Sequence, residues 1–373
     1  MSDKKTVDPL NFEQQLDVVA GQYPMLRIIN EEGKLKDEAL FKELDLSDEE
    51  LIDIMEKMVW SRAYNERTER LAKQGRLGFF APGEGQEASQ IGSILAFDRG
   101  DYMLPGYRDV PQMVYHGMPL YQSYLWSRGH VEGNNYAEDV KLAPPQVIIG
   151  AQIIQAAGVG LGFRMRGEDQ VAFTYTGDGG SSQGDFYEGL NFAGVYKANV
   201  VFYVMNNGYA ISTPREKQSA APTLAQKAAA AGIPGVQVDG MDPLAVLLAS
   251  RRARQWAVSG KGPVLIENIT SRFGPHSLSG DDPKLYRTQE SFDYWSERDP
   301  LLRMRAFLTE RGLWSEEKET EVNERAAEEV REAIQKADDT PKQKVSEFLR
   351  YMFETPTPEL EEQIAEYEEK ENA

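Results

Sequence analysis

Cysteine is absent from this sequence of 373 residues, and histidine occurs only three times. Without cysteine, the chain can form no disulfide framework, no thiolate zinc site and no cysteine nucleophile. The absence also fits a reducing cytoplasm, which is where we expect the protein to act. The first residues, Met1-Ser-Asp-Lys-Lys, lack the apolar core of a signal peptide.

Positive charge is also scarce, because 41 lysines and arginines stand against 60 aspartates and glutamates, a formal net charge of -19. Nucleic acid is therefore not an expected partner, since its phosphates need a basic surface. The acidity indicates either a need for solubility or attraction to a basic partner, and charge alone does not separate the two.

Long apolar runs are missing as well. A membrane helix needs about 20 consecutive apolar residues. The longest apolar run, 147–163, contains Gln152, Gln155 and four glycines. It predicts a buried helix rather than a membrane span, and we expect no membrane attachment.

The sequence does have the composition of a soluble globular protein, with 41% hydrophobic and 27% charged residues. Apolar segments at 171–176, 200–205, 235–240 and 263–269 read as buried strands, and a shorter strand is expected at 102–104. Helix-length segments lie between the strands. This alternation predicts an α/β fold, a doubly wound parallel sheet with helices on both faces.

Three regions are expected, without a clean linker between them. Residues 1–45 form an N-terminal arm, residues 46–290 the α/β cofactor domain, and residues 291–373 a helical C-terminal region. The arm is expected to pack on the main domain or on a neighbouring chain. The C-terminal region is expected to pack on the domain or on a partner.

The helices have recognisable signals. Ser47-Asp-Glu-Glu50 is a capping box that predicts a helix to Lys73, which Gly75 ends. Further helices are expected at 86–97, 110–127, 223–231, 243–258, 315–336 and 342–353, and a Gly/Ala-rich helix from Val147 onward. A long loop is expected at 270–288, and an acidic tail after Pro358.

Two polar motifs follow neighbouring strands. Asp178 ends one strand and Asn207 follows the next, and a right-handed crossover brings both to the carboxyl edge of the sheet. Mg²⁺ prefers oxygen ligands shared with phosphate, so Asp178, Asn207 and the backbone carbonyl of Tyr209 are the predicted ligands. Gly179 and Gly180 let the backbone approach a diphosphate, whose charge suits a helix that we expect to begin near Ser182.

Gly177-Asp178-Gly179, 26 intervening residues and Asn206-Asn207 resemble the thiamine diphosphate motif. From about residue 45 onward, the chain resembles the alpha subunit of the decarboxylating component in the 2-oxo acid dehydrogenase family. The resemblance also rests on Gly85-Gln-Glu-Ala, Gly106-Tyr-Arg, Ile149-Gly-Ala-Gln and Arg272-Phe-Gly-Pro-His-Ser. It implies the thiamine diphosphate-binding fold, with thiamine diphosphate and Mg²⁺ as cofactors.

The resemblance also implies roles for residues outside the central motif. Tyr107, Arg108 and Arg272 would contact the cofactor, with both arginines on the diphosphate. Val147 and Ile149 read as core residues by default, but the resemblance places them beside the aminopyrimidine, with Ile149 as an apolar wedge.

The sequence leaves alternative roles open for the three histidines and for Arg108. His276 corresponds to an active-site histidine that also borders the cofactor, and it is a catalytic candidate. His130, in a loop flanked by glycine, either lines the active site as a second catalytic residue or is simply solvated. His116 lies in a helical pattern and reads as structural or surface-exposed. Arg108, taken alone, reads as a surface arginine paired with Asp109.

The family's reaction is oxidative decarboxylation of a 2-oxo acid, with transfer of the acyl group to a lipoyl disulfide. The resemblance favours pyruvate as the substrate, with branched-chain 2-oxo acids or acetoin as alternative substrates. An alternative outside the enzyme class is a non-catalytic subunit that retains a diphosphate site. No glutamate is marked as the one that activates the cofactor. The resemblance implies that a beta subunit supplies it in an assembly of two alpha and two beta chains. A dihydrolipoyl acyltransferase core with its lipoyl domain would receive the acetyl group.

Overall fold

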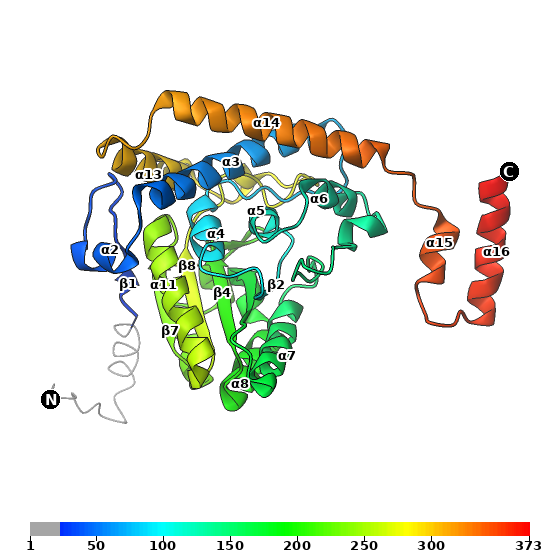
Figure 1. Cartoon of the computed structure of the whole chain (residues 1–373), viewed down its shortest axis with the longest axis horizontal. Helices are drawn as coiled ribbons and strands as arrows, with labels where there is room; N and C mark the ends of the chain where they lie inside the picture. Colours follow the sequence, from blue (N-terminus) through cyan, green and yellow to red (C-terminus); the bar gives the residue numbers. More distant parts are fainter. Residues whose placement is uncertain (1–22) are drawn as a thin grey trace.

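The computed structural model describes residues 23–373 and consists mainly of a twisted sheet with helices around it (Figure 1). All six strands are parallel, in the order β1-β7-β8-β4-β3-β2. Their bounds are β1 Met25–Leu26, β2 Tyr102–Leu104, β3 Ala172–Gly177, β4 Val200–Asn206, β7 Gly235–Asp239 and β8 Val264–Ile269. The expected doubly wound parallel sheet is confirmed.

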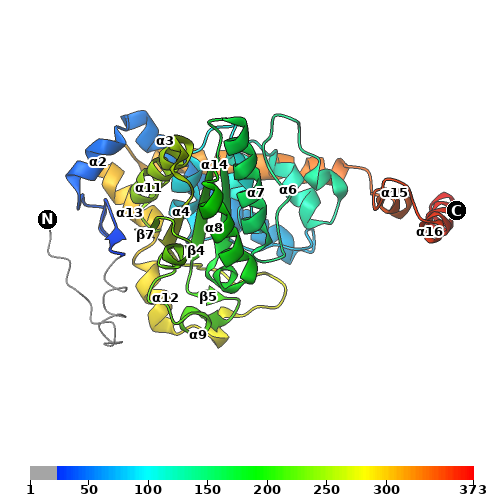
Figure 2. The same cartoon turned by 90° about the horizontal axis from the view of Figure 1, so that it is seen from below.

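The central strands β3, β4 and β8 bury both of their faces, which explains why they read as continuous apolar runs. Residues such as Phe173, Val201 and Tyr203 point to one core, whereas Ala172 and Phe202 point to the other. The first core is covered by α3 (Asp48–Lys73), α4 (Glu87–Ile94), α11 (Pro243–Trp256) and α13 (Pro300–Thr309). The second is covered by α7 (Ala151–Arg166) and α8 (Gly184–Tyr196), which lie side by side in Figure 2.

The long helix α3 begins and ends where its capping signals predict. Ser47 and Glu50 form the capping box, and Gly75 has a φ of 75° just after the helix end. Helix α14 (Glu316–Asp339) lies along α3 and buries an apolar stripe that includes Val322, Ala326 and Val330 (Figure 1). The charged sequence of α14 therefore has one packed face.

The part of the predicted arm that the structure describes joins the main body. Strand β1 pairs with β7, and α2 (Glu38–Leu44) follows it. Ile28 and Ile29 are fully buried, and their backbone N–H groups donate to the Asp242 carboxylate at 2.6 and 2.8 Å. Residues 1–22 lie outside the described part, and the three-region division stays a prediction.

Several expected helices are shorter or interrupted. The segment 86–97 is helical only over α4, and the segment 342–353 only over Val345–Arg350. The segment 110–127 forms α5 (Val110–Tyr115) and α6 (Leu120–Ser127), because Gly117 adopts a φ of 118° and Pro119 follows it. Within 223–231 only α10 (Lys227–Ala230) is helical. The remaining short elements are η1 (Val131–Asn134), β5 (Tyr209–Ala210), β6 (Thr213–Pro214), α9 (Arg215–Gln218), η3 (Ala257–Lys261), η4 (Pro283–Leu285) and α12 (Gln289–Ser296).

The C-terminal residues form a helical hairpin that extends away from the body in both views (Figures 1 and 2). It consists of α15 (Val345–Arg350) and α16 (Pro358–Asn372). The acidic tail is therefore helical, with Thr357 as its N-cap and Pro358 in its first turn. No helix in residues 23–373 is long and apolar enough to cross a membrane.

Candidate functional site

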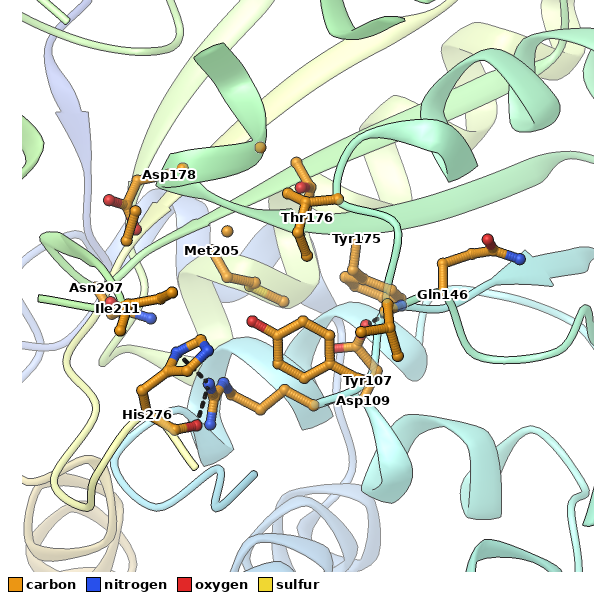
Figure 3. A pocket seen from close by; sticks show the side chains of 18 of the residues that line it. Tyr107, Asp109, Gln146, Tyr175, Thr176, Asp178, Met205, Asn207, Ile211 and His276 are labelled. Atoms are coloured by element: carbon orange, nitrogen blue, oxygen red, sulfur yellow. Dashed lines mark hydrogen bonds between the residues drawn. The ribbon is translucent and has the colours of Figure 1, made fainter. Parts of the chain in front are cut away.

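A cavity of about 540 Å³ opens at the carboxyl ends of β3 and β4. This edge is where parallel α/β sheets bind ligands. Asp178, Asn207 and His276 lie toward one side of the cavity, whereas Tyr107 and Gln146 lie toward the other (Figure 3). Arg108, Val147, Ile149, Gly179, Gly180 and Tyr209 also line it.

The turn after β3 carries the expected glycines. Residues Asp178–Ser182 form the 3₁₀ turn η2, and helix α8 begins at Gly184 rather than near Ser182. A Cβ atom on Gly180 would stand 1.9 Å from Oγ1 of Thr176, and one on Gly179 would stand 2.6 Å from Cβ of Ala210. Glycine is therefore required at both positions for the backbone to lie this close to its neighbours.

Asp178 is a buried carboxylate at the start of this turn. Burial raises its pKa to about 6, although its hydrogen bonds and nearby arginines favour the charged form. Its Oδ2 accepts a hydrogen bond from Nε2 of Gln218 at 3.1 Å. A cation beside Asp178 would offset the cost of keeping this group ionised.

Asn207 lies next to Asp178 on the same edge of the sheet, and its amide is held at both ends. Its Nδ2 donates to Oε1 of Gln86 at 3.0 Å, and its Oδ1 accepts from the backbone N–H of Tyr209 at 3.3 Å. Tyr209 belongs to the small β5–β6 hairpin at the cavity wall. The three predicted metal ligands therefore lie around one cavity.

The three predicted metal ligands are not a cluster of acidic, histidine or cysteine side chains, as many protein metal sites are. Within residues 23–373, no group of three or more histidines, cysteines, aspartates or glutamates could hold a metal ion. One carboxylate, one amide and a backbone carbonyl form a weakly charged oxygen set. Such a set suits a hard cation that takes most of its charge compensation from a phosphate ligand.

Arg108 and His276 form a further part of the cavity wall. The Arg108 guanidinium donates to the His276 carbonyl at 2.9 Å and lies 3.3 Å from its Nδ1. Arg108 makes no pair with Asp109, so the reading as a paired surface arginine is wrong. Burial, Arg108 and Arg272 lower the pKa of His276 to about 4. Arginine can only donate hydrogen bonds, so Nδ1 of His276 accepts from Arg108. The neutral imidazole therefore carries its proton on Nε2.

Arg272 and Arg287 add positive charge beside the cavity. Arg272 is fully buried and donates to the Ile211 carbonyl at 3.2 Å and to the Tyr286 hydroxyl at 3.1 Å. Within residues 23–373, its Nε and Nη1 have no hydrogen-bond partner, nor have Nε and Nη2 of Arg287. Burial and Arg272 lower the pKa of Arg287 to about 10. Arg272 does not itself line the cavity.

The default expectation that Val147 and Ile149 are core residues is wrong. They lie before α7, which begins at Ala151, and their exposed fractions are 55% and 37%. Gly150, which has a φ of 95°, connects them to the helix. Both side chains line the cavity and give it an apolar wall.

The structure does not bring His130 into the cavity. Its Nε2 contacts the Pro341 carbonyl at 3.0 Å, and it lines a separate hollow near the end of α14. We do not retain His130 as a catalytic candidate. His116 is buried against the Asp101 carbonyl at 2.9 Å, which agrees with its structural reading.

Several cavity residues were not singled out from the sequence. Gln86 and Gln218 contact the predicted metal ligands, and Asp109 is a buried carboxyl whose pKa burial raises to about 7. Of these residues, only Gln86 belongs to a motif found in the sequence, Gly85-Gln-Glu-Ala, and that motif suggested no role for it. Glutamine and aspartate are common in turns and at helix starts, so their site role depends on three-dimensional contacts.

Comparison with known proteins places these features in a family. The chain matches the model of the Dehydrogenase E1 component family over residues 55–346. It is 55% identical over 369 residues to the pyruvate dehydrogenase E1 component subunit alpha of Bacillus cereus, covering 99% of this chain and 98% of that protein.

Two further relatives carry the same name. The Bacillus subtilis (strain 168) protein is 56% identical over 363 residues, covering 97% of each chain. The Staphylococcus aureus (strain Mu50 / ATCC 700699) protein is 54% identical over 357 residues, covering 96% of each. From the family match and these nearly full-length alignments, we conclude that the chain belongs to the Dehydrogenase E1 component family.

Proposed function

We propose that this chain is the alpha subunit of the decarboxylating component of a pyruvate dehydrogenase complex. The observation that carries the proposal is the cavity at the ends of β3 and β4. It combines a buried carboxylate and a fixed amide, and Arg272 and Arg287, whose guanidinium groups have unpartnered N–H atoms among residues 23–373, lie beside it. The name of the similar bacterial proteins supports the same reaction.

Thiamine diphosphate fits the groups around this cavity. Gly179 and Gly180 present bare backbone to the cavity, and Nε and Nη1 of Arg272 have no hydrogen-bond partner among residues 23–373. Arg108 and Arg272 would attract the diphosphate, and Val147 and Ile149 would contact the apolar rings. When bound, this cofactor supplies the electron sink that decarboxylation of a 2-oxo acid requires.

Mg²⁺ fits the oxygen atoms near the diphosphate end. Asp178 would supply a carboxylate oxygen, Asn207 its amide oxygen and Tyr209 its backbone carbonyl. The raised pKa of Asp178 shows that its charge is poorly compensated in the protein alone. A divalent cation would lower the free energy of the ionised form and connect it to the phosphate.

His276 is the proposed catalytic residue of this chain. Its neutral imidazole lies in the cavity wall and carries its proton on Nε2, so it can donate a hydrogen bond to a developing oxyanion. Arg108 holds the ring through Nδ1 and through the His276 carbonyl. Tyr107 packs edge-on against the same ring, with 5.8 Å between ring centroids.

A beta subunit would complete the site. Asp109 and Asp178 are the carboxyl side chains that line the cavity, and no glutamate among residues 23–373 lines it. Asp178 is already assigned to the metal, and Asp109 accepts the backbone N–H of Gly106 at 2.7 Å. We infer that the partner supplies the activating carboxylate and that a dihydrolipoyl acyltransferase receives the acetyl group. The cytoplasmic location stays a prediction.

The substrate can be tested with the chain co-expressed with a beta subunit. We expect kcat/KM for pyruvate to exceed that for 3-methyl-2-oxobutanoate, with an artificial electron acceptor as readout. A preference for the branched substrate would replace pyruvate with a branched-chain 2-oxo acid. Cofactor binding without turnover of any 2-oxo acid would favour a non-catalytic subunit.

A further inference from the structure

We propose that Gln86 is a positioning residue that orients the Asn207 amide, so that the amide oxygen is available to the metal. This inference rests on the proposed magnesium site. Gln86 is almost fully buried and lines the same cavity as Asn207. It lies in the Gly85-Gln-Glu-Ala motif, at the start of α4.

The orientation of an asparagine amide decides whether it can bind a cation. Oδ1 is a ligand for Mg²⁺, whereas the Nδ2 group carries two hydrogens and repels it. Oε1 of Gln86 accepts a hydrogen bond from Nδ2 of Asn207 at 3.0 Å. The Tyr209 N–H donates to Oδ1 at 3.3 Å, so both contacts require the same orientation.

Gln86 is itself held in place by the loop before α4. Gly85 has a φ of 92°, and a Cβ atom there would stand 2.4 Å from the Ser271 carbonyl. The Thr270 hydroxyl donates to the Gly85 carbonyl at 3.2 Å, and the Phe273 N–H donates to the Glu84 carbonyl at 2.8 Å. The loop is thus fastened to the segment that follows β8, which fixes Gln86 relative to the neighbouring strand end.

Residues that hold metal ligands in orientation typically change metal affinity about 10- to 100-fold when they are replaced. We therefore expect Gln86→Met, which removes the acceptor but keeps the side-chain length, to raise the Mg²⁺ midpoint about 10-fold or more. Gln86→Glu keeps an acceptor oxygen and should stay within about 3-fold of wild type. If the methionine variant fails to assemble, Gln86→Ala carries the same expectation.

The background Asn207→Asp provides the sharpest test. A carboxylate has no nitrogen to misplace, so Gln86→Met should change the Mg²⁺ midpoint by less than about 3-fold in this background. Gln122→Leu is a matched control, because Gln122 is also buried but bonds to the Glu132 and Asn135 carbonyls instead. It should leave the midpoint unchanged.

The experiment is equilibrium dialysis of thiamine diphosphate against the alpha–beta assembly over a series of Mg²⁺ concentrations. An unchanged midpoint in Gln86→Met, or an equal shift with and without Asn207→Asp, would overturn the positioning role. A weaker binding of thiamine diphosphate even at saturating Mg²⁺ would also overturn it. If Asn207→Ala leaves the midpoint unchanged, the metal assignment itself is wrong, which distinguishes that failure from the failure of this inference.

Discussion

Arg272 permits a prediction that separates a binding residue from a structural one. Its side chain is fully buried, yet Nε and Nη1 have no hydrogen-bond partner in the described part of the chain, where the carboxylate of Asp281 lies 4.0 Å away. That aspartate already accepts from the Tyr286 hydroxyl at 2.8 Å. A buried cation with so little compensation costs stability until an anion binds. We therefore consider the change Arg272→Met.

The effect on the isolated chain should be small. Arg272→Met loses the contacts with the Ile211 carbonyl and the Tyr286 hydroxyl, but it also removes a like charge that helps to lower the pKa of Arg287. Replacing a poorly paired buried charge with an apolar side chain is often neutral, so the free energy of unfolding should change by less than about 1 kcal/mol.

The effect on cofactor binding should be large. Arg272 lies behind the part of the cavity wall that Ile211 forms, so a binding role requires its two unpartnered N–H groups to reach the diphosphate. Each such charge-assisted hydrogen bond is worth at least about 1.5 kcal/mol. Their loss amounts to about 3 kcal/mol, which corresponds to more than about 100-fold in affinity.

Arg303 offers a matched control. It is equally buried, but its Nη1 lies 2.7 Å from Oδ2 of Asp239. Arg303→Met leaves that carboxylate with Arg27 as its remaining ion-pair partner, so we expect it to lower the free energy of unfolding by about 3 kcal/mol. Its effect on cofactor affinity, measured with the assembled protein, should be negligible.

Urea unfolding of the isolated chain and calorimetric titration of thiamine diphosphate into the alpha–beta assembly measure the two quantities. The reasoning fails if Arg272→Met destabilises the chain as much as Arg303→Met does, or if cofactor affinity is retained. Either result would show that Arg272 mainly supports the loop after β8.

Three other predictions follow from the site. Asp178→Ala and Asn207→Ala should each abolish Mg²⁺-dependent cofactor binding while the far-ultraviolet circular dichroism stays unchanged; retained affinity would refute the metal assignment. His276→Ala should slow reductive acetylation of a lipoyl domain about 100-fold or more, well beyond its effect on pyruvate turnover with an artificial acceptor, and equal losses would contradict a specific role in transfer. Burial and Glu69 raise the pKa of Glu84 from its ordinary 4.5 to about 7, so stability is lost as the pH rises from 4.5 to about 7 and stays level above that. Glu84→Gln should therefore raise the free energy of unfolding by about 2 kcal/mol at pH 8 and have almost no effect at pH 4, as urea titrations would show; an equal gain at both pH values would refute this origin.

Five of the six strands could be predicted from the sequence because they depend on local patterns, whereas the short edge strand β1 carries no such pattern. Apolar strands ending in glycine, aspartate or asparagine predicted the edge that carries Asp178 and Asn207. The capping box at Ser47 predicted the start of α3. Tyr107 and Arg108 line the cavity, as the family motif suggested.

Other features depend on contacts that no local pattern shows. Val147 and Ile149 are apolar, so composition favoured the core, but they form an exposed cavity wall. His130 lies in a loop flanked by glycine, which made it a catalytic candidate. In the structure, however, its Nε2 contacts the segment after α14. Gln86 approaches Asn207 across 121 positions of sequence, a pairing that only the folded chain reveals.

The central claim is that this chain contributes half of an active site that decarboxylates pyruvate. The most direct measurement is pyruvate-dependent reduction of an artificial acceptor by the purified chain, by a beta subunit and by both together, with thiamine diphosphate and Mg²⁺. We predict no turnover by either chain alone and full turnover by the pair, lost with Asp178→Ala. Full turnover by this chain alone, shown to be free of beta subunit, would contradict the account.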